Sequence, residues 1–143
     1  MKGKLWTIAA ERMKMGKEHR LPLSEPALKI LKKLAEIKSG DYVFPSNGGK
    51  PLSNMAMLVL LRRMKRDDIT VHGFRSTFRD WCAEQTNYPR EVAEAALAHS
   101  IGNNVEAAYR RGDLLEKRTQ LMNEWARFCY QPKAKGKVMK IRG

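Results

Sequence analysis

The sequence contains little cysteine, comparatively few acidic residues and no long apolar stretch. Cys82 and Cys129 are the only two cysteines among 143 residues, and each falls at an apolar position of a helical pattern, so we expect buried reduced thiols. No apolar run approaches the length of a transmembrane helix, and residues 1–4 lead into a strand pattern and not into a signal-peptide hydrophobic region. We therefore expect a soluble cytoplasmic protein with no membrane partner.

Signatures of nucleotide and metal sites are absent as well. The sequence has no P-loop, no dinucleotide-binding glycine pattern, no zinc-type spacing of Cys and His, and no internal repeat. His19, His72 and His99 lack the spacing of metal ligands. These absences exclude the commonest nucleotide and metal functions, and we expect no cofactor.

Positive charge, in contrast, is present in large excess. Twenty-eight Lys and Arg residues against fifteen Asp and Glu residues give a formal net charge of +13. This exceeds what solubility needs and is typical of proteins that bind nucleic acid, although charge alone leaves a general polyanion binder open. An RNA-binding protein would more typically show exposed aromatic residues on a sheet, and no such pattern is visible.

The length and the hydrophobic periodicity predict one domain of mainly α structure with a small antiparallel β-sheet (α+β). Alternation predicts strands over residues 5–9 and 20–23, joined through a turn at 14–17. Helical spacing and capping residues predict helices over about 24–38, 53–65, 71–84, 89–98 and 105–111, and a last helix from Asp113, which with Glu116 resembles a capping pair. We expect a domain over residues 1–130 and a flexible basic tail over 131–143.

Apolar residues at helical spacing predict the buried faces. The helix that follows Ser24 is expected to cover the sheet with its apolar stripe. The remaining expected core positions are Met55, Leu58, Val59 and Leu61 in the second helix, Phe74, Phe78, Trp81 and Cys82 in the third, and Leu115, Met122, Trp125 and Cys129 in the last.

Residues His72, Arg75 and Arg79 occupy one face of the helix over 71–84, because positions three and four apart are neighbours on a helix. That spacing alone is equally typical of a solvated basic face. Later in the chain His99 ends an apolar helix, and Tyr109 lies among small residues with Arg110 and Arg111 behind it.

With these residues in place, the sequence resembles the tyrosine recombinases, specifically the phage-type integrases of mobile genomic islands. The resemblance extends over nearly the whole chain up to Phe128. It is carried by Trp6-Thr7-Ile8, Arg12-Met13-Lys14, His19-Arg20-Leu21-Pro22-Leu23-Ser24, Tyr42-Val43-Phe44-Pro45-Ser46, His72-Gly73-Phe74-Arg75, Leu97-Ala98-His99, Ala108-Tyr109-Arg110-Arg111 and the stretch from Arg118 to Trp125-Ala126.

The resemblance implies a role for each matching residue. Tyr109 matches the nucleophile that forms a 3′-phosphotyrosyl bond to DNA and leaves a 5′-hydroxyl. Arg75 matches an arginine that holds the phosphate, His72 a histidine assigned to proton transfer, and His99 a hydrogen-bond donor to the phosphate. Lys14 matches the lysine that protonates the leaving oxygen, with Lys17 in the same turn as its rival. We expect Arg79, Lys17, Arg110 and Arg111 to contact DNA.

These residue types suit the implied chemistry. A free tyrosine is only about 0.1% ionised at pH 7, so activating it must lower the barrier by up to about 4 kcal/mol. Charge that builds up on a five-coordinate phosphorus is stabilised by fixed cationic donors. Because Arg, His and Lys supply such donors, the reaction needs neither a divalent metal nor ATP.

The sequence also departs from the family pattern. Another catalytic arginine of the family lies in a Gly-x-Arg context upstream of the strand that contains Trp6, and Arg12 cannot be assigned to it by motif. The resemblance therefore implies a partial catalytic domain, from a shortened chain or a broken gene, with weak or no strand cleavage in isolation. Its expected partners are double-stranded attachment sites and other copies of itself on nucleoid DNA. The alternative function is a non-catalytic DNA-binding module, and target sequence and direction of recombination stay open.

Overall fold

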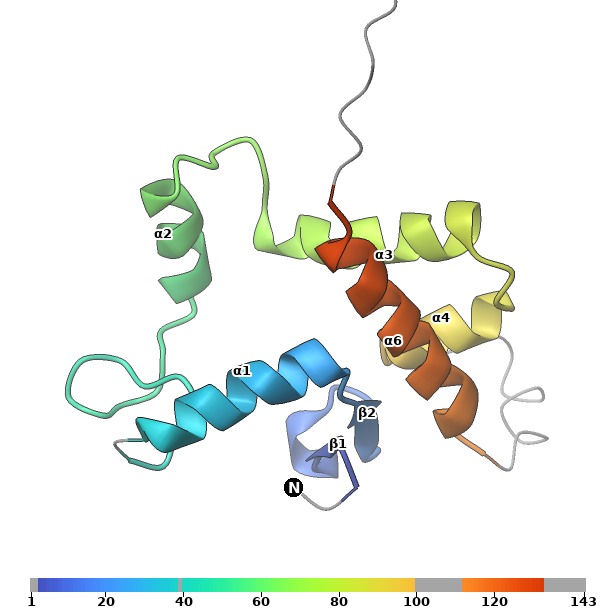
Figure 1. The fold of residues 1–143 in the computed structure, drawn as a ribbon. Helices are drawn as coiled ribbons and strands as arrows, with labels where there is room; N and C mark the ends of the chain where they lie inside the picture. Colours follow the sequence, from blue (N-terminus) through green and yellow to red (C-terminus); the bar gives the residue numbers. More distant parts are fainter. Residues whose placement is uncertain (1–2, 39, 100–111, 133–143) are drawn as a thin grey trace, which may run out of the picture.

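The computed structural model describes residues 3–38, 40–99 and 112–132, and its fold is mainly helical with a small two-stranded sheet, as predicted (Figure 1). In chain order the elements are β1 (Leu5–Ile8), the short 3-10 helix η1 (Ala10–Arg12), β2 (His19–Pro22), α1 (Glu25–Glu36), α2 (Ala56–Arg63), α3 (Val71–Gln85), α4 (Arg90–Ala96) and α6 (Leu115–Tyr130). The helix predicted over 105–111 and most of the predicted tail lie outside the described residues.

The two strands form the predicted antiparallel hairpin. Leu5 lies opposite Pro22 and Ile8 opposite His19. The connection contains η1 and a turn at Gly16, whose φ of 60° lies in the left-handed region that glycine adopts without steric cost. This turn carries a run of exposed polar residues away from the sheet.

The core of the described chain lies between α3, α4 and α6. Its buried residues are Phe78, Trp81, Cys82, Val92, Ala93, Ala96 and Leu121. Trp125 of α6 packs edge-on against Phe78 at a centroid distance of 5.3 Å and lies 5.1 Å from Trp81. Aromatic pairs in this range are favourable beyond the apolar area that they bury, so the ring cluster joins α3 firmly to α6.

Some expected core positions are exposed instead. Phe74 is 54% exposed, because it lies a full turn before the part of α3 that α6 covers. Cys129 is also exposed, while Cys82 is buried as predicted and burial raises its pKa to about 11. The prediction was therefore wrong for Phe74 and Cys129, since helical spacing identifies a face but not how far along the helix a neighbour reaches.

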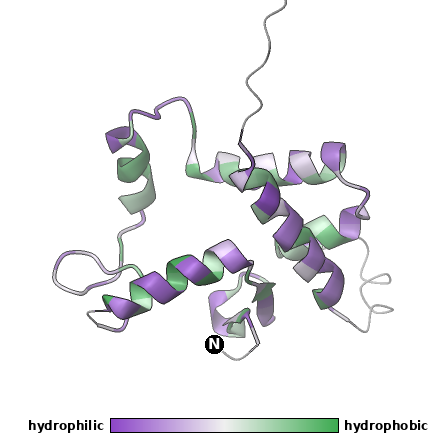
Figure 2. Ribbon diagram, in the orientation of Figure 1, coloured by the Kyte–Doolittle hydropathy of each residue, from purple (hydrophilic) through white to green (hydrophobic). Residues whose placement is uncertain are grey.

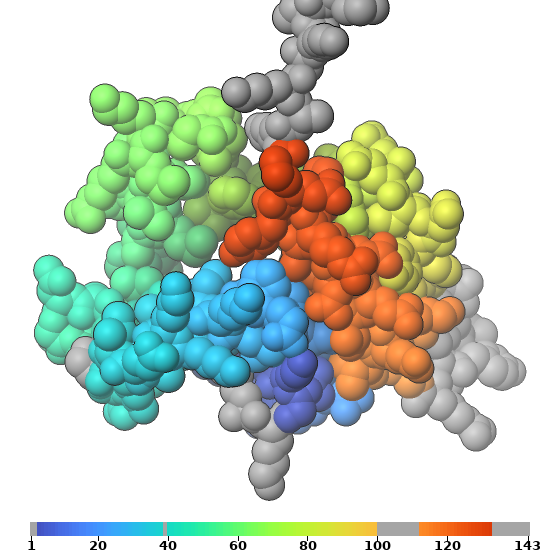
Figure 3. Space-filling view, in the orientation of Figure 1, coloured from blue at the N-terminus to red at the C-terminus, as the bar shows by residue number. Residues whose placement is uncertain are grey.

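The helix α1 begins after Ser24, with Pro26 in its first turn, as predicted, but none of its residues is fully buried. It packs against α6, and the two helices lie against each other on the visible face in Figure 3. A hollow lined by Leu31, Leu34 and the 41–45 segment opens beside its apolar stripe. The helix was expected to cover the sheet with this stripe, but its main contact among the described elements is with α6.

The helix α2 departs furthest from the expected core. Figure 2 shows hydrophobic residues along almost the whole helix, and only Leu61 is buried. Met55 is 52% exposed and Val59 37% exposed. The prediction of a core helix was wrong here because periodicity records an apolar face and carries no information about which element covers it.

The helix α6 begins without the predicted capping pair. Its N-cap is Leu114 in the left-handed conformation, with no side-chain cap bond. Asp113 instead accepts hydrogen bonds from Arg20 in β2, where its Oδ2 lies 3.0 Å from Nε and 2.8 Å from Nη2. The carboxylate that was expected to cap α6 therefore connects this helix to the hairpin.

Among the helices that the structure describes, none combines the length and the hydropathy needed to cross a membrane.

Candidate active site

The first turn of α3 positions the basic face predicted from the sequence. Thr70 caps this helix, and its Oγ1 accepts a hydrogen bond from the backbone N–H of Gly73 at 3.1 Å. The cap fixes where the helix begins, and therefore the direction in which His72 and Arg75 project one turn apart. A Cβ at position 73 would lie 3.4 Å from Thr70 Oγ1, at the edge of ordinary van der Waals contact.

The structure brings four of the predicted site residues to one open pocket. Its lining consists of His72, Arg75, Ser76, Arg79, Asp80, Leu97 and His99, and its volume is about 330 Å³. The three basic residues of α3 thus share one side of the helix, as predicted, and they lie beside the residues that follow α4. Such a cluster of donors in a concave site suits an anion with several oxygens, such as a phosphodiester.

The end of α4 turns sharply to bring His99 to this pocket. Ala98 adopts a left-handed φ of 53°, and the backbone N–H of His99 donates to the carbonyl of Glu94 at 2.9 Å. This 6→1 bond is the Schellman arrangement that ends many helices. Arg75 braces the same turn, because its Nη2 donates to the carbonyl of Leu97.

Sequence reasoning missed Glu94, which lies beneath the pocket. Its side chain is only 8% exposed, and its oxygens lie 2.8 Å from Arg79 Nε, 2.5 Å from His99 Nδ1 and 3.5 Å from Arg90 Nε. Burial by itself would raise the pKa of Glu94, but the hydrogen bond with His99 and the charge of Arg79 outweigh it, so the pKa lies below its ordinary value. An acid inside the apolar run Val92-Ala93-Glu94-Ala95-Ala96 is the signal that could have identified it.

The predicted lysines lie elsewhere. Lys14 and Lys17 are exposed in the connection between β1 and β2, and neither lines the pocket. Tyr109, Arg110 and Arg111 lie outside the described residues. The structure therefore brings together the residues that were predicted to hold the phosphate, and their roles, like those of the lysines and of the tyrosine, stay predictions.

A second group that the sequence did not reveal joins the hairpin to α6. Arg118 of α6 is 1% exposed, and it donates to the carbonyl of Arg20 and, at 3.2 Å, to the carbonyl of Asp113. Its Nη2 also lies 3.4 Å from His19 Nε2. Burial and the neighbouring guanidinium lower the pKa of His19. This buried arginine fixes the strand that precedes α1 against the core.

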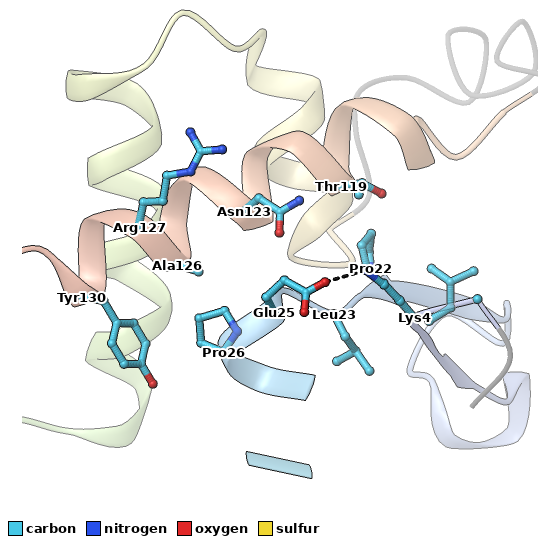
Figure 4. Close-up of a pocket in the computed structure, with 12 residues that line it drawn as sticks. Lys4, Pro22, Leu23, Glu25, Pro26, Thr119, Asn123, Ala126, Arg127 and Tyr130 are labelled. Carbon is cyan, nitrogen blue, oxygen red and sulfur yellow. Dashed lines mark hydrogen bonds and ion pairs between the residues drawn. The ribbon is translucent and has the colours of Figure 1, made fainter. Parts of the chain in front are cut away.

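A larger hollow of about 560 Å³ lies between the hairpin, the start of α1 and α6 (Figure 4). Lys4 and Glu25 form an ion pair at this hollow, and Asn123 and Arg127 of α6 contribute to its wall. It contains none of the predicted site residues, so size is a poor guide to the site here. Within residues 3–38, 40–99 and 112–132, no three metal-binding side chains gather in one place.

Comparisons with known proteins identify the family to which the chain is similar. The model of the phage integrase family matches residues 1–114. The chain is 38% identical over 125 residues to "Prophage integrase IntA" of Escherichia coli K12, covering 85% of this chain and 30% of that protein. It is 34% identical over 142 residues to "Integrase" of Enterobacteria phage P4, with 85% and 32% covered.

A third relative is "Integrase" of Shigella phage Sf6, at 30% identity over 125 residues, with 84% of this chain and 32% of that protein covered. The chain thus spans about a third of the length of these curated relatives. No solved structure shows significant similarity to it. The family match over most of the chain and the order of its motifs show that this chain belongs to the phage integrase family.

Proposed function

We propose that this chain is part of the catalytic domain of a tyrosine recombinase that cuts and rejoins DNA at specific sites. The observation that carries the proposal is the gathering of His72, Arg75 and His99 around one open pocket, from two helices. A scissile phosphate requires several donors around one site, and the lining of one pocket by three basic side chains supports this proposal.

The proposed reaction uses Tyr109 as the nucleophile. Its oxygen attacks the phosphorus, its proton passes to His72, and the bond from phosphorus to the 5′ oxygen breaks. Arg75 and His99 hold the non-bridging oxygens, while Lys14 gives a proton to the departing oxygen. The 3′-phosphotyrosyl bond conserves the energy for rejoining, so the cycle uses neither a divalent metal nor ATP.

The surrounding charge suits a DNA partner. The net charge of +13 favours a long polyanion, and Arg79, Lys17, Arg110 and Arg111 are the proposed further contacts. We further propose attachment-site DNA on the nucleoid as the substrate and a homo-multimer on that DNA as the working form. Because the chain spans a third of its relatives, we expect the isolated chain to cleave weakly or not at all.

The test uses a duplex with a 5′-bridging phosphorothiolate, whose thiolate leaving group cannot readily rejoin, so that a covalent adduct accumulates. The chain is assayed alone and joined to the upstream sequence of its gene. Tyr109→Phe should abolish the adduct, and Tyr130→Phe, a change at an exposed tyrosine, should leave it intact. An undiminished adduct in Tyr109→Phe would disprove the nucleophile, and duplex binding without any adduct would favour the non-catalytic DNA-binding module.

The same substrate separates Lys14 from Lys17. A thiolate leaves without being protonated, because its conjugate acid is several pKa units stronger than an alcohol. If Lys14 is the general acid, Lys14→Ala should slow cleavage of the ordinary duplex by about 10²-fold or more. The same variant should cleave the phosphorothiolate duplex at nearly the normal rate. Lys17→Ala should show no such rescue, and the reverse pattern would assign the proton to Lys17.

A further inference from the structure

We propose that Glu94 is a positioning residue for the phosphate pocket. Its buried carboxylate fixes the ring of His99 so that Nε2 is directed toward the phosphate. The proposal rests on the proposed function and adds a residue to it that makes no contact with DNA.

The geometry leaves one orientation for the imidazole. His99 Nδ1 lies 2.5 Å from Glu94 Oε2, at a helix end that is fixed by the backbone bond between the same two residues. The two ring nitrogens lie on opposite sides of the imidazole, so a ring held by Nδ1 presents Nε2 away from the carboxylate. His99 also lines the pocket and its side chain is 44% exposed, so Nε2 is directed toward the side where His72 and Arg75 lie.

The carboxylate also determines which nitrogen carries the proton. A carboxylate accepts hydrogen bonds and cannot donate one, so Nδ1 must bear a hydrogen. When the ring takes up a second proton, that proton is on Nε2, and the imidazolium donates a charge-assisted bond to a phosphate oxygen while Glu94 balances its charge. Glu94 thus holds His99 ready to act as a cationic donor.

The second oxygen of Glu94 is engaged independently. Oε1 lies 2.8 Å from Arg79 Nε, and arginine is always a donor in proteins. In Glu94→Gln the single amide oxygen should therefore accept the hydrogen bond from Arg79, and the amide NH₂ should face His99 Nδ1. A donor at that place requires Nδ1 to accept, so the neutral ring should change to the tautomer protonated on Nε2.

The test is long-range ¹H–¹⁵N NMR of the 143-residue chain at about pH 9, well above the ordinary pKa of an imidazole. The wild-type ring should carry its proton on Nδ1, Glu94→Gln should carry it on Nε2, and Glu94→Asp, which keeps the charge, should resemble wild type. A wild-type ring protonated on Nε2, or an unchanged tautomer in Glu94→Gln, would overturn the role of Glu94. If Glu94→Gln does not fold, the wild-type and Glu94→Asp spectra still test the proposal, because a ring protonated on Nε2 in either protein would overturn the role of Glu94.

A titration with inorganic phosphate near neutral pH adds a functional readout, through the ring proton signals of His72 and His99. Glu94→Gln removes a negative charge, so electrostatics alone predicts tighter binding. Positioning predicts binding that is weaker by about threefold to tenfold, because a charge-assisted bond loses its geometry. Glu91→Gln removes the same charge from the same helix and should not weaken binding, and Glu94→Asp should recover part of the affinity.

The outcomes separate the two proposals. Tighter or unchanged phosphate binding in Glu94→Gln, or equal weakening in Glu91→Gln, would overturn the positioning role while wild type still binds phosphate. A wild-type chain whose histidine signals do not respond to phosphate would overturn the phosphate pocket and with it the proposed function, even where Glu94 determines the tautomer of His99.

Discussion

The unit of α3, α4 and α6 contains nearly all the fully buried apolar residues of the described chain, whereas α1 contains none and α2 only Leu61. Both regions have clear helical periodicity in the sequence. Leu121 of α6 is 0% exposed, while Leu60 of α2 is 53% exposed. The difference teaches that an apolar stripe stabilises the fold only where the same chain supplies the opposing surface.

The two regions also differ in what holds the site. His72, Arg75 and Arg79 project from the well-packed α3, and His99 is tied to α4 through Glu94. Rings from α3 and α6 interlock behind them. The proposed phosphate site needs donors fixed to within about 0.5 Å, and the packed unit can supply that rigidity. Lys14, the proposed proton donor, lies instead on the exposed connection between β1 and β2.

The largest expected effect concerns the link between the packed unit and the hairpin. Arg118→Ala removes a guanidinium that is 1% exposed and leaves the carbonyls of Arg20 and Asp113 without their donor. Leaving a buried carbonyl without its donor costs about 1–3 kcal/mol for each carbonyl. Urea unfolding should show this loss, and Arg127→Ala, at an exposed position of the same helix, should change stability by less than about 0.5 kcal/mol. A loss below about 1 kcal/mol for Arg118→Ala would mean that the hairpin is not held through this residue.

A paired truncation tests the difference in packing directly. Leu121→Ala should destabilise the chain by about 3 kcal/mol, because it leaves a cavity among α3, α4 and α6. Leu60→Ala removes the same atoms from α2 and should change the free energy of unfolding by less than about 0.5 kcal/mol. Equal losses in the two variants would show that α2 is buried in solution, and the contrast between the regions would disappear.

Much of the packed unit and of its basic face was predictable from local sequence. The capping role of Thr70 and the shared helix face of His72, Arg75 and Arg79 follow from spacing of one turn, and the structure has both features. The hairpin followed from alternation in two short segments. These are local properties, so the residues that determine them are close together in the chain.

What could not be predicted depends on contacts between distant residues. Asp113 was expected to cap α6, but it bonds to Arg20, which lies 93 residues away in the sequence. Glu94 is an acid within the apolar run over residues 92–96, and its partner Arg79 comes from a different helix. Helical spacing cannot reveal that Arg118 is buried, because a lone arginine in an amphipathic helix ordinarily faces solvent.

A smaller effect should appear as a dependence of stability on pH. His19 lies beside the buried Arg118, with Asp113 nearby, and burial together with Arg118 holds its pKa below the ordinary value of 6.5. The unfolded chain therefore takes up this proton more readily than the folded chain. The stability that comes from keeping His19 neutral should be fully present above about pH 6.5. It should be lost as the pH falls below this value, toward the lower pKa of the folded state.

Urea midpoints at about pH 7.5 and about pH 5.5 test this, because that window lies above the range in which carboxylates such as Glu94 titrate. The decrease in midpoint between the two pH values should be smaller in His19→Gln than in wild type. The amide of glutamine can still accept from Arg118, so the variant keeps the contact and loses only the titration. An equal decrease in both proteins would show that His19 does not oppose protonation in the folded state. The stability of the contact between the hairpin and the packed unit would then not depend on the charge of the His19 ring.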